Sequence, residues 1–204
     1  KPFYVSHYGR HGSRYLLGDR DYLWIIQLMQ KADSLNGLTP LGKDVLKRLT
    51  LVWQEVQGRA GDLTPLGVRQ HQGIAERMTK NFPEVFRGKR SVSARSTVVY
   101  RCAMSMAAFG DRLKGLNPQL DISYEMSEKY MSYLNYNAFT HGEKGPWVEE
   151  YRKFEEQQVK PDRLVSTLFS NADFIRCEVN PNNLMWGLYW IAVDMQDIET
   201  PVSF

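Results

Sequence analysis

The stretch that decides the fold is Gly9-Arg10-His11-Gly12-Ser13-Arg14, which follows a run of apolar and aromatic residues at 2–8. The run predicts a buried strand, and the glycines allow the sharp angles and close ligand approach of a tight turn. Two guanidinium groups flank one imidazole. An arginine matches two phosphate oxygens at once, and its charge disfavours the imidazolium form of the histidine. A neutral imidazole beside a phosphoryl group held by arginines is suited to nucleophilic attack on phosphorus.

A second charged segment runs from Arg95-Ser96-Thr97 to Arg101, after a predicted strand at 90–94. It opens a predicted helix, and helix starts present free N–H groups and positive partial charge, which suit anions. Strand ends placed side by side in a parallel sheet meet at one edge. We therefore expect Arg101 to contact the same phosphate as the two arginines of the first segment.

The remaining periodicity predicts mostly helices. Leu38-Thr39-Pro40-Leu41-Gly42 recurs as Leu63-Thr64-Pro65-Leu66-Gly67, and each copy places a threonine N-cap before a proline at the first helical position. Two copies are too few for a solenoid, so the repeat indicates one helix start used twice. The expected elements are helices at 21–32, 40–57, 65–81, 97–116, 146–158, 161–170 and 181–195, and strands at 2–8, 90–94 and 121–124.

This order of elements predicts an α/β fold, in which a sheet with helices on both faces precedes a helical cap. We place an α/β catalytic core at residues 1–124 and a helical cap-like subdomain at residues 125–204. No low-complexity linker separates the two, so we expect them to pack against each other.

The composition is that of a globular protein. The 204 residues are 43% hydrophobic and 24% charged, which excludes wholesale disorder. A net charge of +3 does not indicate a nucleic-acid binder, so any anion site must be local. The apolar runs are too short to span a bilayer, and four dispersed histidines predict no metal centre. Cys102 and Cys177 exclude a disulfide-rich scaffold, and either two free thiols or one disulfide remain open.

Residues 10–14 resemble the signature of the histidine phosphatase superfamily. The second arginine favours the histidine acid phosphatase branch, which holds acid phosphatases, phytases and multiple inositol polyphosphate phosphatases, over the phosphoglycerate-mutase branch. Residues 63–67 with Gln70-His71, and residues 95–97 with Arg101, match the branch in order and approximate spacing. The resemblance implies a phosphoglycerate-mutase-like three-layer α/β/α sandwich with a helical cap. It also implies a periplasmic or secreted location, although no signal peptide is recognisable in the chain.

The same resemblance implies hydrolysis of phosphomonoesters. His11 is similar to the nucleophile that becomes phosphohistidine, and Arg10, Arg14 and Arg101 resemble the arginines that bind phosphate. No cofactor and no metal is implied. The implied partner is a phosphorylated small molecule, with inositol polyphosphates such as phytate as the favoured class, and neither nucleic acid nor a membrane. We expect structural roles for His7 and His71.

One family feature does not appear in this sequence. A late His-Asp or His-Ala-Glu motif supplies the family's second phosphate-binding histidine and its proton donor, and His141-Gly142-Glu143 does not match that motif. We therefore expect the chain to be the N-terminal part of a longer protein, incomplete at the C-terminus. Two alternatives stay open: a phosphate-binding module without turnover, which the missing motif supports, and a phosphotransferase or mutase.

Overall fold

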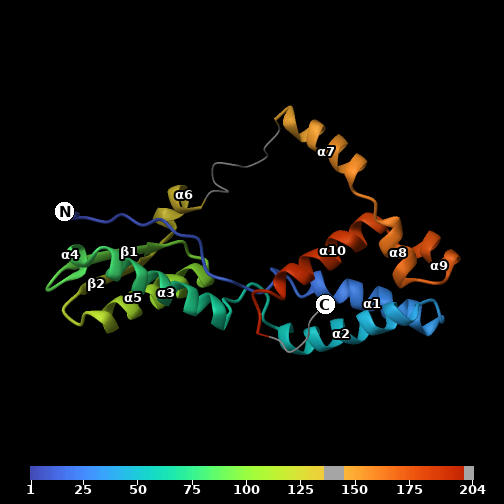
Figure 1. The fold of residues 1–204 in the computed structure, drawn as a ribbon, viewed down its shortest axis with the longest axis horizontal. Coiled ribbons are helices and arrows are strands. Elements are labelled where there is room, and N and C mark those ends of the chain that lie inside the picture. Colours follow the sequence, from blue (N-terminus) through green and yellow to red (C-terminus); the bar gives the residue numbers. More distant parts are fainter. Residues whose placement is uncertain (136–144, 200–204) are drawn as a thin grey trace. The chain divides into compact units, whose positions relative to one another are not determined.

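The structure is a computed structural model that describes residues 1–135 and 145–199, so His141 and Glu143 lie outside the described residues. None of the described helices is long and apolar enough to cross a membrane. In chain order the elements are α1 (Arg20–Ser34), α2 (Pro40–Val56), α3 (Pro65–Asn81), α4 (Pro83–Phe86), β1 (Ser91–Ser96), α5 (Tyr100–Leu116), β2 (Asp121–Met126), the 3₁₀ helix η1 (Glu128–Tyr130), α6 (Met131–Leu134), α7 (Trp147–Gln158), α8 (Asp162–Leu168), α9 (Ala172–Glu178) and α10 (Pro181–Asp194) (Figure 1).

The chain divides into two compact units, each built from two segments. The first unit comprises Lys1–Tyr15 and Gly61–His141, and the second comprises Leu16–Ala60 and Gly142–Phe204. Residues 16–60, which include α1 and α2, therefore belong to the same unit as α8 and α10. The expected domain boundary after residue 124 stays a prediction.

The first unit contains a small parallel sheet. Strands β1 and β2 pair in parallel, with Ser91 opposite Asp121 and Ser96 opposite Met126. Helix α5 connects the two strands and packs on both, and α3 packs on α5 (Figure 1). Two parallel strands joined through a helix form a βαβ unit, so the predicted α/β class is confirmed. The core beneath the helices is formed by Ala75, Phe86, Leu113 and Leu120, with Met78, Val85, Val92, Phe109 and Ile122 packed around them.

The strand predicted at residues 2–8 is wrong. These residues form no strand, and the side chains of Phe3 and Tyr4 are 93% and 72% exposed. A run of apolar residues indicates burial, but a strand also needs a hydrogen-bonded neighbour. Among the described residues, the sheet has only the order β1-β2, and the segment at 2–8 has no ladder partner.

The second unit is helical. The apolar face of α1 recurs at helical spacing and is buried, and it packs against α2 and α10, while α8 contacts α2 and α10 (Figure 1). The buried Tyr22 hydroxyl on α1 donates a hydrogen bond to the carboxylate of Asp194 on α10. Burial, followed by this carboxylate, raises the pKa of Tyr22 well above its usual range. The phenol therefore remains a neutral donor that ties the two helices together.

Both copies of the repeated helix start cap their helices as predicted. The Oγ1 atom of Thr39 accepts a hydrogen bond from the Gly42 N–H (3.0 Å), and that of Thr64 accepts one from the Gly67 N–H (3.1 Å). Each helix begins at the following proline. These bonds satisfy donors that a helix start would otherwise leave unpaired.

Each copy also binds a remote part of the chain: the His11 segment for Thr64 and the end of α8 for Thr39. Thr39 donates its N–H to the carbonyl of Leu168 (3.0 Å), and Thr64 donates its N–H to the carbonyl of Ser13 (2.9 Å). The residue before each threonine forms an antiparallel bridge with the residue after that carbonyl. One local motif therefore holds a remote segment twice, once in each unit.

The cysteines are both free. Cys102 is half-buried near the start of α5, and Cys177 is exposed near the end of α9. The sequence left open either two free thiols or one disulfide, and the structure has two free thiols. Cys177 lies outside the core.

Candidate active site

The start of α3 holds the segment of residues 10–14, which we call the His11 loop. The carbonyl oxygen of Ser13 accepts two hydrogen bonds from Thr64, one from its N–H (2.9 Å) and one from its hydroxyl (3.1 Å). The side-chain amide of Gln70 accepts from the Ser13 N–H and donates to the Ser13 hydroxyl, both at 2.8 Å. Main-chain and side-chain groups of one helix thus fix the backbone of the loop.

Helix α5 holds the other side of the loop. The N–H of Gly12 donates to the hydroxyl of Ser105 (3.1 Å), and that hydroxyl donates to the carbonyl of Arg101 (2.8 Å). Because Arg101 lies in the first turn of α5, the two segments singled out in the sequence meet through Ser105. Ser105 was not predicted as a site residue, because its only signal in the sequence is a position one helical turn after Arg101.

His11 is half-buried and its ring is oriented by the backbone. The Nδ1 atom lies 2.7 Å from the carbonyl oxygen of Gly12. A neutral imidazole that donates through Nδ1 keeps an unshared electron pair on Nε2. The loop backbone therefore favours the tautomer that is protonated at Nδ1 and unprotonated at Nε2.

The surroundings of His11 favour its neutral form. Burial lowers its pKa most, the charges of Arg101, Arg10 and Arg14 lower it further, and the hydrogen bond to Gly12 opposes this shift. The structure thus brings together the four residues predicted from the sequence. Their roles in binding and catalysis stay predictions.

Arg101 has a donor that suits an anion. Its Nε atom is buried and has no hydrogen-bond partner among the described residues, and the same holds for the Oγ1 atom of the buried Thr97. A buried donor without an acceptor costs about 1–3 kcal/mol, so an oxyanion placed there would remove that cost. Arg14 differs, because one of its terminal nitrogens donates to the carbonyl of Tyr15 (2.7 Å).

Arg95 is engaged elsewhere. Its Nε atom lies 3.6 Å from the carboxylate of Glu125, and its guanidinium lies over the ring of Tyr130, 5.1 Å from the ring centre. The carboxylate and the aromatic ring both stabilise the cation where it is. The two arginines of the second segment therefore have different surroundings.

The other two described histidines make structural contacts. His71 is buried on α3, its Nε2 atom lies 3.2 Å from the carbonyl oxygen of Arg10, and burial lowers its pKa. His7 stacks on Phe109, with ring centres 5.7 Å apart and ring planes 14° apart. His71 therefore supports the loop backbone, and His7 packs against α5.

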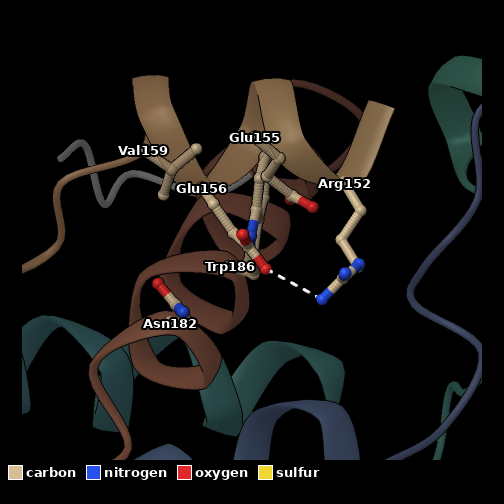
Figure 2. Close-up of a pocket in the computed structure, with 6 residues that line it drawn as sticks. All are labelled: Arg152, Glu155, Glu156, Val159, Asn182 and Trp186. Carbon is tan, nitrogen blue, oxygen red and sulfur yellow. Dashed lines mark hydrogen bonds and ion pairs between the residues drawn. The ribbon is translucent and has the colours of Figure 1, made fainter. Parts of the chain in front are cut away.

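A cavity of about 400 Å³ lies between α7 and α10 of the second unit. Figure 2 shows the residues that line it: Arg152, Glu155, Glu156, Val159, Asn182 and Trp186. Arg152 donates to Glu156 (3.1 Å) and to Glu149 (2.8 Å), so its charge is already neutralised. None of the predicted site residues lines this cavity.

Comparisons with known proteins give matches in structure only. No protein-family model and no curated protein matches the chain. Three solved structures of Bifidobacterium longum multiple inositol polyphosphate phosphatase do match. The complex with inositol hexasulfate has a TM-score of 0.69 and 16% identity, the apo form 0.64 and 17%, and the complex with phosphate 0.62 and 17%. The chain has the fold of these structures; 96% of it is covered, but it spans only 56–57% of their length.

Proposed function

We propose that the protein is a phosphomonoester hydrolase that acts through a phosphohistidine at His11. The observation that carries the proposal is a half-buried imidazole whose pKa is lowered by burial and by three arginines, one of which, Arg101, has a buried Nε atom without a hydrogen-bond partner among the described residues. Such a site attracts an anion and keeps a nucleophile unprotonated in its presence. The match in fold to phosphatases supports the proposal.

The reaction has two steps. In the first, Nε2 of His11 forms a bond to phosphorus, the ester P–O bond breaks, and an acid gives a proton to the leaving oxygen. In the second, water attacks phosphorus and gives a proton to the conjugate base of that acid, the N–P bond breaks, and phosphate leaves with the neutral imidazole and the acid restored. Arg10, Arg14 and Arg101 stabilise the charge on the phosphoryl oxygens in both steps. We propose that the proton donor belongs to a part of the protein outside this chain.

Inositol polyphosphates are the substrate class that we favour. The matching proteins are named multiple inositol polyphosphate phosphatases, and their structures contain inositol hexasulfate or phosphate. The chain spans only part of their length, so the substrate class is proposed here together with the reaction. Release of phosphate from inositol hexakisphosphate and from a simple aryl phosphate by the full-length protein would compare the two classes.

The test of the mechanism is to trap the covalent intermediate. The full-length protein is mixed with a substrate carrying radioactive phosphate and quenched, and the protein-bound label is tested for the acid lability of phosphohistidine. His11→Ala should abolish the label and nearly all turnover. His7→Ala, which removes a stacked histidine of the same segment, is the control and should keep both. Undiminished label on the His11→Ala variant would reject His11 as the nucleophile, and anion binding without any turnover would favour the phosphate-binding module.

A further inference from the structure

We propose that Ser105 is a positioning residue that sets the place of His11 relative to Arg101; this inference rests on the proposed function. Ser105 is only 3% exposed, so its hydroxyl is largely shielded from bulk water. It donates to the carbonyl of Arg101 (2.8 Å) and accepts from the N–H of Gly12 (3.1 Å). One hydroxyl thus joins the backbone of the phosphate-binding helix to the backbone of the nucleophile loop.

The glycine held by Ser105 is also the one that orients the nucleophile. Gly12 donates its N–H to Ser105 and accepts from the Nδ1 atom of His11 (2.7 Å) through its carbonyl. A shift of Gly12 would therefore change both the distance from His11 to Arg101 and the hydrogen bond that selects the tautomer of His11. Ser105 acts on the reaction through these two residues, without touching the substrate.

Removal of the hydroxyl leaves the Gly12 N–H in a buried place without its acceptor. A buried N–H without a partner is unfavourable, so the loop would move to find another acceptor. Misplacement of a reacting group by about 1 Å lowers the rate by about a hundredfold. For Ser105→Ala we expect kcat to fall by about tenfold to a hundredfold, with a much smaller change in KM.

Two readouts separate positioning from a loss of stability. The first is the split between kcat and KM in the full-length protein. The second is the histidine ¹⁵N spectrum, in which the two ring nitrogens of a neutral imidazole give different signals. We expect the wild-type His11 to be protonated at Nδ1 alone, and Ser105→Ala to show both tautomers. Ser105→Thr keeps a hydroxyl that can bond to the carbonyl of Arg101, and it should recover most of kcat.

The matched control is Thr79→Ala on α3. The hydroxyl of Thr79 donates to the carbonyl of Ala75 four residues earlier (2.9 Å), as Ser105 does to Arg101. It has no hydrogen bond to the His11 loop among the described residues. Thr79→Ala should therefore leave kcat and the tautomer of His11 as in the wild type.

The outcomes distinguish this inference from the proposed function. Wild-type turnover with unchanged kcat and an unchanged tautomer in Ser105→Ala would overturn the role of Ser105 alone. If the wild type forms no phosphohistidine, the proposed function fails, and the ¹⁵N spectrum still decides whether Ser105 orients His11. If Ser105→Ala does not fold, Ser105→Cys, whose thiol is a weaker donor, is measured instead. An intermediate loss of kcat would support the proposal, and wild-type kcat would overturn it.

Discussion

Gly12 and Gly67 lie against each other so closely that neither position has room for a β-carbon. A Cβ atom built on Gly12 would lie 2.5 Å from the carbonyl oxygen of Gly67, and one built on Gly67 would lie even closer to the carbonyl oxygen of Ser13. Both obstacles are backbone atoms, which cannot rotate away as a side chain does. The His11 loop therefore sits on the first turn of α3 by direct backbone contact.

Gly12→Ala should lower the free energy of unfolding by about 1–3 kcal/mol, the usual cost of overpacking. It should also lower turnover, because the loop has to move away from α3. Gly115→Ala is the control, since a Cβ atom at this helical position would meet nothing within 4 Å. We expect it to be neutral or to stabilise by about 0.5–1 kcal/mol. Urea unfolding of both variants tests this, and equal destabilisation would contradict the contact.

Thr64→Ala and Thr39→Ala compare the two copies of the helix start. Each substitution removes an N-cap, so each should lower the free energy of unfolding by about 1 kcal/mol. Only Thr64 also donates its hydroxyl to Ser13 in the His11 loop, whereas Thr39 donates to the carbonyl of Thr167 (2.6 Å). Turnover should therefore fall in Thr64→Ala and stay near the wild type in Thr39→Ala. Steady-state kinetics and thermal unfolding of both variants would show this. Equal activities would argue against a role of Thr64 in holding the His11 loop for turnover.

Arg101→Ala should remove about 2–4 kcal/mol of transition-state stabilisation, which lowers kcat/KM by about 30-fold to 1,000-fold. Its buried Nε atom is without a described partner, so a bound oxyanion is the acceptor that it lacks. Arg95→Ala should change kcat/KM by only a few fold, because Arg95 contacts Glu125 and Tyr130 instead. Kinetics of both variants provide the measurement. Equal, small losses would mean that the second segment does not contact the substrate.

Stability should fall on mild acidification. Burial lowers the pKa of both His11 and His71 below the usual value of about 6.5, so the unfolded chain binds their protons more tightly. Their contribution is complete above about pH 6.5 and is lost as the pH falls from there towards their pKa values in the folded protein. The free energy of unfolding should thus decrease between pH 7 and pH 5, and His71→Gln should show a shallower decrease. If the free energy of unfolding of His71→Gln falls with pH as steeply as that of the wild type, His71 does not contribute to the pH dependence.

Local signals in the sequence predicted seven of the described helices, but not the short helices α4, α6 and α9. The threonine and proline at residues 39–40 and 64–65 define helix starts by themselves. The charged residues at 10–14 and 101 were predicted to share one site because each segment follows a predicted strand, and parallel strand ends meet at one edge of a sheet. Longer-range features were missed or wrong. Residues 2–8 have the composition of a strand, but pairing depends on a neighbour that composition does not reveal. The hydrogen bonds of Thr39 to residues 167–168 and of Ser105 to Gly12 join positions far apart in the chain.

The hydrogen bond between Gly12 and Ser105 has a consequence for the order of events on the ribosome. Its two partners are 93 residues apart, and the bonds of the loop to Thr64 and Gln70 span 51 and 57 residues. At about 5–20 residues per second, the ribosome would need about 5–20 s after making Gly12 before Ser105 exists. During that interval the loop with its two arginines has no complete scaffold. For that interval the nascent chain therefore carries the His11 loop without the hydroxyl that joins it to α5.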